Sequence, residues 1–95
     1  MIIESLQQHP NASPFNQPVD AEALNLPTYH RVIKHPMDFG TISTSTYQSV
    51  GQFREDVQLV FKNCYKFNGP RAEVSEWARQ VEMFFEELWA EVFPH

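Results

Sequence analysis

The sequence is poor in several features that would point to particular classes of protein. It has a single cysteine, Cys64, so no disulfide can form within the chain, and a reducing compartment such as the cytosol or the nucleus fits best. No apolar run approaches the roughly 20 residues that span a bilayer. The opening MIIESLQQ also lacks the basic start and the apolar length of a signal peptide. We therefore expect no membrane association and no structural disulfide.

Basic residues are also scarce. Seven Lys and Arg against twelve Asp and Glu give a formal net charge of −5. This charge argues against direct contact with nucleic acid, whose phosphates need a basic surface, and favours a basic partner such as a Lys/Arg-rich tail. The four histidines and Cys64 lack the spacing of a metal site, so we expect no metal and no other cofactor.

The chain does contain enough apolar surface for one core. Its 95 residues are 42% hydrophobic and 14% aromatic, while charged residues make up 20%. A chain of this length forms one domain rather than two. We expect residues 1–95 to be a single domain excised from a larger protein.

The second half of the chain predicts two long amphipathic helices. The first follows a candidate N-cap, Ser49, and ends at the Gly69-Pro70 break. The apolar positions of its buried face are Phe53, Val57, Val60, Phe61 and Cys64. Those of the second helix are Val74, Trp77, Ala78, Val81, Phe85, Leu88 and Val92. Because the apolar face of each helix must be buried against another element, we expect two antiparallel helices joined by a short loop.

The first half predicts shorter helices around a stiff connection. In MIIESLQQ the residues Ile2, Ile3 and Leu6 form the apolar face of a short helix or of the last turns of a longer one, and PMDFGTI begins another helix with Asp38 as its N-cap. Between them the chain carries the five prolines Pro10, Pro14, Pro18, Pro27 and Pro36. Proline disfavours regular helix or central strand, so this stretch is predicted to be a long ordered loop, in which LPTYHRVIKH makes one or two helical turns. No strand-like alternation appears, and the prediction is an all-α bundle of four helices.

Two long segments resemble the motifs of one family. PFNQPVDAEALNLPTYHRVIKHPMDFGTI, followed by FREDVQLVFKNCYKFNGPRAEV, is similar to a bromodomain, and closely to those of the BET type. The resemblance covers nearly the whole chain, with the motifs in the family order. It implies a left-handed four-helix bundle whose long first loop and last short loop form an apolar pocket for acetyl-lysine. It further implies a nuclear reader module that binds acetylated histone tails, catalyses no reaction and is monomeric as an isolated domain.

The resemblance also implies roles for individual residues. Asn68 would donate a hydrogen bond to the acetyl carbonyl, Tyr29 would hold a bridging water to the same oxygen, and Val74 would stand at the mouth as gatekeeper. The walls would be formed by the loop residues Pro14, Phe15, Val19, Leu24 and Leu26 and by the helix residues Cys64 and Tyr65. No catalytic residue is implied.

Two stretches depart from the BET pattern. Ser13 stands where BET members carry a tryptophan, so the aromatic shelf beside the pocket lacks its largest ring. Between Ile42 and Tyr47 the chain is about four residues shorter than the family pattern, which predicts that the second bundle helix loses roughly one turn.

The chemistry of acetyl-lysine explains why an asparagine suits such a site. Acetylation converts an ammonium, which only donates, into a neutral amide with a carbonyl acceptor. A selective pocket therefore needs an uncharged donor at the bottom of an apolar slot. Asn68 offers an NH2 donor, and we expect its own carbonyl to be held by backbone, which would fix the direction of the amide.

The residues taken alone leave alternatives open. Asn68 could simply cap a helix before Gly69, Tyr29 could be a packing residue, and Val74 fits core packing as well as gatekeeping. The alternative function is a helical protein–protein adaptor with a degenerate acetyl-lysine pocket. An enzyme using Cys64 would need a thiolate-stabilising neighbour and an oxyanion donor, which the sequence does not display.

Overall fold

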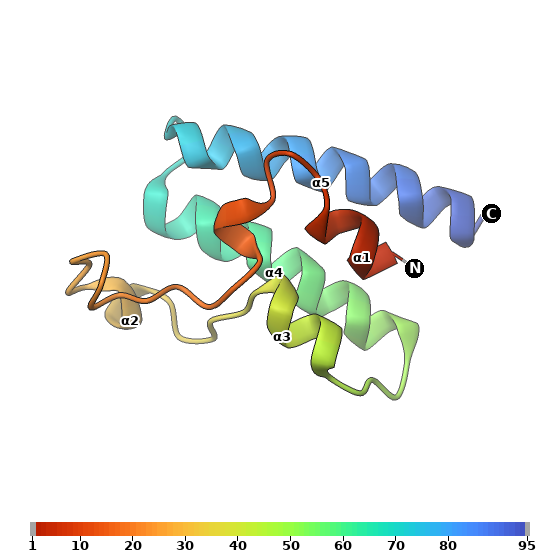
Figure 1. The fold of residues 1–95 in the computed structure, drawn as a ribbon, viewed down its shortest axis with the longest axis horizontal. Helices are drawn as coiled ribbons and strands as arrows, with labels where there is room; N and C mark the ends of the chain where they lie inside the picture. The colour runs from red at the N-terminus through yellow and green to blue at the C-terminus, as the bar shows by residue number, and fades with distance from the viewer. Residues whose placement is uncertain (1, 95) are drawn as a thin grey trace.

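The computed structural model describes residues 2–94 and contains helices but no strand within them. Four helices form the bundle: α1 (Ile2–Gln7), α3 (Phe39–Thr44), α4 (Val50–Asn68) and α5 (Glu73–Val92). Helices α1 and α4 each contact both α3 and α5, so the four close into a ring (Figure 1). The predicted all-α fold is therefore confirmed. None of the helices in residues 2–94 is long and apolar enough to cross a membrane.

The long connection between α1 and α3 is ordered by local turns. It contains the 3-10 helix η1 (Ser13–Phe15) and the one-turn helix α2 (Tyr29–Val32), which packs on α4. Backbone bonds such as that from the amide of Leu26 to the carbonyl of Ala21, at 2.8 Å, satisfy polar groups that a proline-rich loop would otherwise leave open. The connection and the α4–α5 turn lie at one end of the bundle, opposite the two chain termini (Figure 1).

Two helix starts use the side chains that the sequence predicts. The hydroxyl of Ser49 accepts from the backbone amide of Gln52 at 3.2 Å, at the start of α4. A carboxylate oxygen of Asp38 accepts from the amide of Thr41 at 2.9 Å, at the start of α3. Each cap satisfies a donor that has no partner within its helix. Both N-cap predictions are confirmed.

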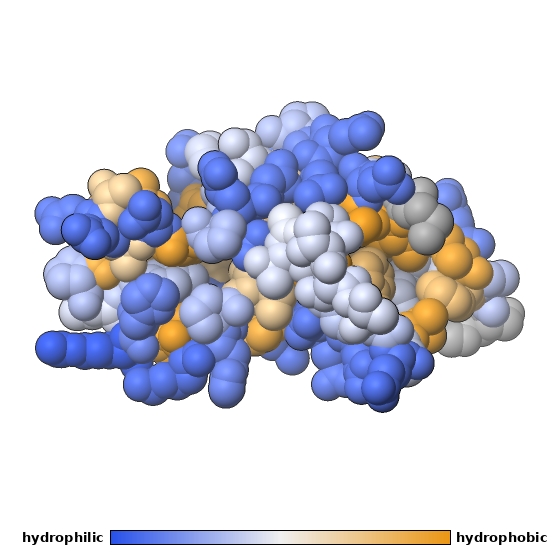
Figure 2. Space-filling view, turned by 60° about the horizontal axis from the view of Figure 1, so that its bottom comes forward, coloured by the Kyte–Doolittle hydropathy of each residue, from blue (hydrophilic) through white to orange (hydrophobic). Residues whose placement is uncertain are grey.

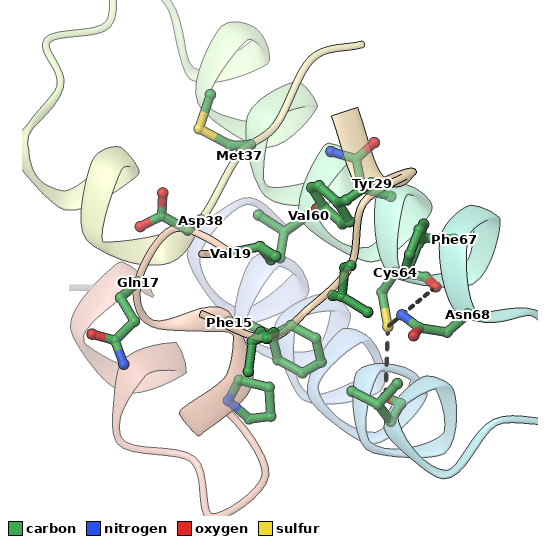
Figure 3. Close-up of a pocket in the computed structure, with 15 residues that line it drawn as sticks. Phe15, Gln17, Val19, Tyr29, Met37, Asp38, Val60, Cys64, Phe67 and Asn68 are labelled. Atoms are coloured by element: carbon green, nitrogen blue, oxygen red, sulfur yellow. Dashed lines mark hydrogen bonds between the residues drawn. The ribbon is translucent and has the colours of Figure 1, made fainter. Parts of the chain in front are cut away.

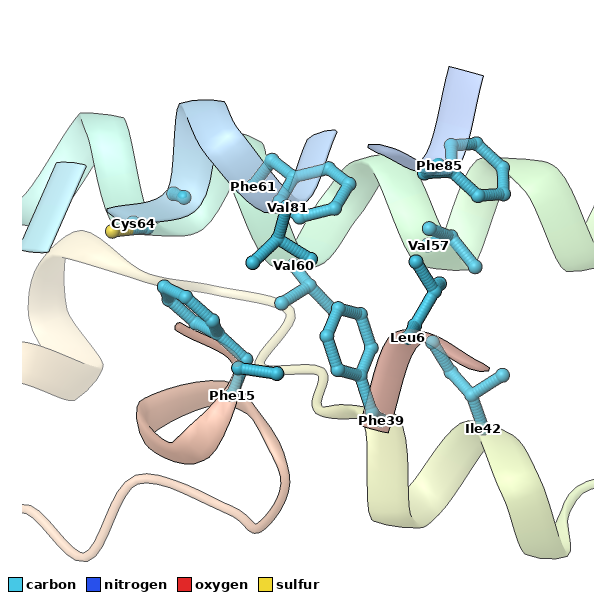
Figure 4. Close-up of a cluster of buried hydrophobic side chains, with 12 residues drawn as sticks. Leu6, Phe15, Phe39, Ile42, Val57, Val60, Phe61, Cys64, Val81 and Phe85 are labelled. Atoms are coloured by element: carbon cyan, nitrogen blue, oxygen red, sulfur yellow. The ribbon is translucent and has the colours of Figure 1, made fainter. Parts of the chain in front are cut away.

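The core lies where the four helices meet (Figure 4). Phe39, Phe61 and Phe85 are fully buried in it, and the rings of Phe39 and Phe61 meet edge to face with centroids 6.0 Å apart. Burying one such side chain contributes about 1.5–3 kcal/mol. Because these rings come from α3, α4 and α5, one cluster ties these three helices together.

The predicted apolar faces are buried or partly buried, with two exposed exceptions on α5. Trp77 is 37% exposed because it lies at the margin of its helical face, and Val92 is 55% exposed because it is the last residue of the helix. Near this end a second apolar groove is lined by Ile2, Ile3, Val50, Phe53, Trp89, Val92 and Phe93. Figure 2 shows hydrophobic residues gathered beside the termini as well as at the loop end.

Candidate functional site

A pocket of about 170 Å³ opens between the long connection, the C-terminal half of α4 and the first turn of α5 (Figure 3). Most of the side chains around it are apolar. It is lined by Pro14, Phe15, Gln17, Val19, Leu24, Leu26, Tyr29, Met37, Asp38, Val60, Asn63, Cys64, Phe67, Asn68 and Val74. The structure thus brings together every site residue that the sequence suggested except Tyr65.

Helix α4 supplies the back wall of the pocket with one face. Its lining residues follow the i, i+3, i+4, i+7, i+8 spacing of adjacent positions on a helix surface. They are Val60, Asn63, Cys64, Phe67 and Asn68. The sequence did not lead us to predict three of these lining residues, Val60, Asn63 and Phe67. Counting back from Asn68 at helical spacing would have found them.

Asn68 is the last residue of α4 and lies at the exposed edge of the pocket. Its side-chain Nδ2 donates to the backbone carbonyl of Cys64 at 3.1 Å and lies 3.7 Å from the Cys64 Sγ. The prediction that the Asn68 carbonyl is held by backbone is therefore wrong, because the NH2 group is held instead. An NH2 group has two hydrogens, and beyond the Cys64 carbonyl the only acceptor for them within residues 2–94 is the Cys64 sulfur, which is a weak one.

The backbone just after Asn68 turns sharply. Gly69 ends α4 with a φ of 85°, which glycine adopts without a side-chain penalty, and its amide donates to the carbonyl of Tyr65 at 2.9 Å. Pro70 follows and cannot continue the helix hydrogen bonding. The turn ends α4 at Asn68, so that its amide is not covered by a further helical turn.

Tyr29 lies on the other side of the pocket and is 6% exposed. Its ring meets the Phe67 ring with centroids 4.8 Å apart, which anchors α2 on α4. Burial, with a smaller contribution from Cys64, raises the pKa of Tyr29 above its usual value. The hydroxyl therefore stays neutral at physiological pH, and it has no hydrogen-bond partner within the described chain.

Cys64 contributes a buried thiol to the same wall. Burial raises the pKa of Cys64, so the thiol stays protonated. Its Sγ lies 3.7 Å from the carbonyl of Val74, and no histidine lines the pocket. A nucleophile needs a thiolate and a base to form it. These surroundings disfavour an enzyme that uses Cys64.

Tyr65 does not line the pocket, which corrects the expectation from the sequence. Its hydroxyl donates to a carboxylate oxygen of Glu82, on α5, at 2.6 Å. Burial and this carboxylate raise the pKa of Tyr65 well above its usual range. Successive helix residues point about 100° apart, so the neighbour of an inward-facing Cys64 meets a different element.

The long connection forms the front wall. Phe15 is buried there, whereas Leu24 is 61% exposed and lies at the mouth. Ser13 is exposed and is not among the lining residues, so it adds no surface to the pocket.

The segment before α3 adds Met37 and Asp38, which the sequence analysis did not place in the pocket. Both Asp38 carboxylate oxygens are engaged by Thr41, one by its amide at 2.9 Å and one by its hydroxyl at 2.6 Å. The side chain of Asn63 donates to the carbonyl of His35 at 2.8 Å and ties this segment to α4. No cluster of three metal-ligating side chains occurs in residues 2–94.

Comparisons with known proteins agree with this arrangement. A family model described as Bromodomain matches residues 1–80. The chain is 45% identical over 82 residues to Bromodomain-containing factor 2 of Saccharomyces cerevisiae, covering 82% of this chain and 13% of that protein. It is 43% identical over 81 residues to Bromodomain-containing factor 1 of Candida albicans, covering 81% of this chain and 11% of that protein.

A third relative extends over nearly all of the chain. Bromodomain-containing factor 1 of S. cerevisiae is 40% identical over 97 aligned residues, covering 95% of this chain and 14% of that protein. The chain therefore spans between 11% and 14% of the length of these relatives. Both the family match and these identities show that the chain belongs to the bromodomain family, whose members are acetyl-lysine-binding modules rather than enzymes.

Proposed function

We propose that this bromodomain takes an acetyl-lysine side chain into the pocket of Figure 3, with Asn68 as the donor to the acetyl carbonyl. The observation that carries the proposal is the exposed Asn68 amide at the pocket edge, whose Nδ2 contacts, within residues 2–94, only the Cys64 carbonyl at 3.1 Å and the weakly accepting Cys64 Sγ at 3.7 Å. The bond to the Cys64 carbonyl orients the amide, and a ligand carbonyl is a stronger acceptor than the Cys64 sulfur for the other hydrogen.

The other polar groups of the pocket suit a neutral ligand. Tyr29 and Cys64 both have raised pKa values and stay uncharged, and the Asp38 carboxylate is already engaged by Thr41. A water on the Tyr29 hydroxyl would reach the same carbonyl as Asn68. An unmodified lysine would carry its ammonium between apolar walls with little to solvate it, which costs several kcal/mol or forces loss of the proton. Selectivity for the acetylated form comes mainly from that penalty.

The expected affinity is modest. One neutral hydrogen bond contributes about 0.5–1.5 kcal/mol, and each buried methyl or methylene group adds about 0.8 kcal/mol. After the cost of association, a single mark should bind in the micromolar to millimolar range, at roughly −4 to −8 kcal/mol. Tighter binding would need a second mark or a second linked reader.

We propose basic histone-type tails as the partner and the nucleus as the location. The net charge of −5 favours such a tail. Acidic residues also flank the lining residues in the chain: exposed Asp20 follows Val19, and exposed Glu73 precedes Val74. The BET-type assignment rests on the sequence motifs and stays a prediction.

The test is calorimetric titration of a diacetylated histone-tail peptide and its unmodified twin into the wild type and Asn68→Ala. We expect heat only from the acetylated peptide and only with the wild type. Gln80→Ala is the matched control, because it removes a side-chain amide from an exposed site on α5, outside the pocket. If Asn68→Ala binds the acetylated peptide as tightly as the wild type does, the proposed role of Asn68 is wrong.

The adaptor function makes a different prediction for the same titration. A degenerate pocket would give no heat with any acetylated peptide, although the protein is folded by circular dichroism. That outcome would remove the reader function and leave the helical surfaces as the sites to examine.

A further inference from the structure

Ser75 is a polar residue that is fully buried. It follows the pocket residue Val74 at the start of α5, and its exposed fraction is 0%. A buried hydroxyl without a hydrogen bond is costly, so its partner shows what the residue stabilises. The Ser75 hydroxyl donates to the carbonyl of Gly69 at 2.7 Å, across the turn between α4 and α5.

Among residues 2–94 the Gly69 carbonyl has only one other donor. The backbone amide of Ala72 reaches it at 3.4 Å, which is a long and weak hydrogen bond. The Ser75 side chain therefore supplies the short bond that fixes this carbonyl. Gly69 directly follows Asn68, so the bond holds the Gly69–Pro70 peptide unit, one residue beyond the proposed acetyl-lysine donor.

A second contact links Ser75 to the same asparagine from the side. The Ser75 hydroxyl lies 3.9 Å from the Cys64 Sγ, and that sulfur lies 3.7 Å from the Asn68 Nδ2. The carbonyl of Cys64 accepts the hydrogen bond that orients the Asn68 amide. Ser75 thus touches both the backbone after Asn68 and the residue that holds its side chain.

We propose that Ser75 is a positioning residue for Asn68. Its hydroxyl closes the α4–α5 turn and keeps the Asn68 amide pointing its second N–H at the pocket. This inference rests on the proposed function, since it gives Asn68 the role of the donor. Without the hydroxyl the Asn68 amide would also adopt orientations that cannot bind the acetyl carbonyl. The measured affinity would then fall in proportion to the fraction of molecules with the binding orientation.

The test compares the wild type with Ser75→Ala by two measurements. The first is the nuclear magnetic resonance signal pair of the Asn68 side-chain NH2, recorded without peptide. The second is the affinity for the diacetylated histone-tail peptide. We expect the Asn68 signals to move in Ser75→Ala and the affinity to weaken by about two- to tenfold.

A control separates positioning from a general loss of stability. Ile42→Val shortens a side chain that is buried in α3 and does not line the pocket. It should lower the melting temperature while leaving the Asn68 signals and the affinity unchanged. If Ser75→Ala does not fold, Ser75→Cys, which nearly keeps the volume but has a weaker donor, carries the same expectation.

Asn68 signals that stay at their wild-type positions in folded Ser75→Ala would overturn the inference. This readout does not depend on peptide binding. If the wild type binds no acetylated peptide, the proposed function fails, whereas the position of the Asn68 signals still decides the role of Ser75.

Discussion

The hydrophobic core and the acetyl-lysine pocket are built from similar apolar residues but treat polar groups in opposite ways. Apart from the Cys64 thiol, the core cluster contains only apolar side chains. The pocket shares Phe15, Val60 and Cys64 with that cluster and adds the Tyr29 hydroxyl and the Asn68 amide. Within residues 2–94 the Tyr29 hydroxyl has no hydrogen-bond partner, and the Asn68 NH2 has only the Cys64 carbonyl and the weakly accepting Cys64 sulfur. The core is therefore complete without a ligand, and the pocket is not.

This difference means that stability and binding should separate by residue. A side chain that belongs only to the core should affect the free energy of unfolding, and the Asn68 amide should affect binding alone. Asn63 stands between the two regions, because it lines the pocket and also ties the segment before α3 to α4. Substitutions in the core, at Asn63 and at the mouth of the pocket test whether stability and binding separate in this way.

The largest effect is expected in the core. Phe61→Ala removes a fully buried ring that packs against Phe39 and should lower the free energy of unfolding by about 3–5 kcal/mol. The free energy of unfolding of a native protein is only about 5–15 kcal/mol in total, so the variant would be close to unfolding. Urea unfolding measures the change. A loss below about 1 kcal/mol would contradict the view that the core holds the bundle together.

An intermediate effect on both properties is expected at Asn63. Asn63→Ala removes the 2.8 Å hydrogen bond to the His35 carbonyl and should cost about 1–3 kcal/mol of stability. It should also weaken acetyl-peptide binding, because the wall that includes Met37 is no longer fixed to α4. Parallel urea and calorimetric titrations measure the two effects, with Gln80→Ala as the surface control. A stability loss with wild-type affinity would show that this bond belongs to the core region alone.

The smallest effect is expected at the mouth. Ser13 is exposed beside the lining residue Pro14, so Ser13→Trp should leave stability nearly unchanged and restore an aromatic shelf. An added aromatic contact contributes about 0.5–1.5 kcal/mol, so the acetylated peptide should bind up to roughly tenfold tighter. Calorimetry against the wild type measures it. No gain in affinity would mean that the shelf is irrelevant in this bromodomain.

Features set by local sequence were predictable. The buried face of α4 from Val57 to Cys64 follows from helical spacing, and the N-caps at Asp38 and Ser49 follow from their side chains and position. The proline-rich loop that brings Leu26 into the pocket wall follows from the family motif. In each case the needed information lies within a few turns of helix or within one motif.

Features that depend on contacts between distant segments were not predictable. Spacing alone did not reveal that Tyr65 turns to Glu82 on α5, 17 residues later. It also did not indicate that the Asn68 NH2, rather than its carbonyl, is held by backbone. Ser75 reads as a small polar residue near a helix start, and only its burial against the Gly69 carbonyl gives it a role. Such partners are chosen by tertiary packing.

The most direct test of the account is the Asn68 side-chain NH2 signal during titration of the wild type with the acetylated histone-tail peptide. We predict that the signal of one of the two NH2 protons shifts strongly as the peptide binds, because the other proton stays on the Cys64 carbonyl. Peptide binding with both Asn68 protons unmoved would contradict it.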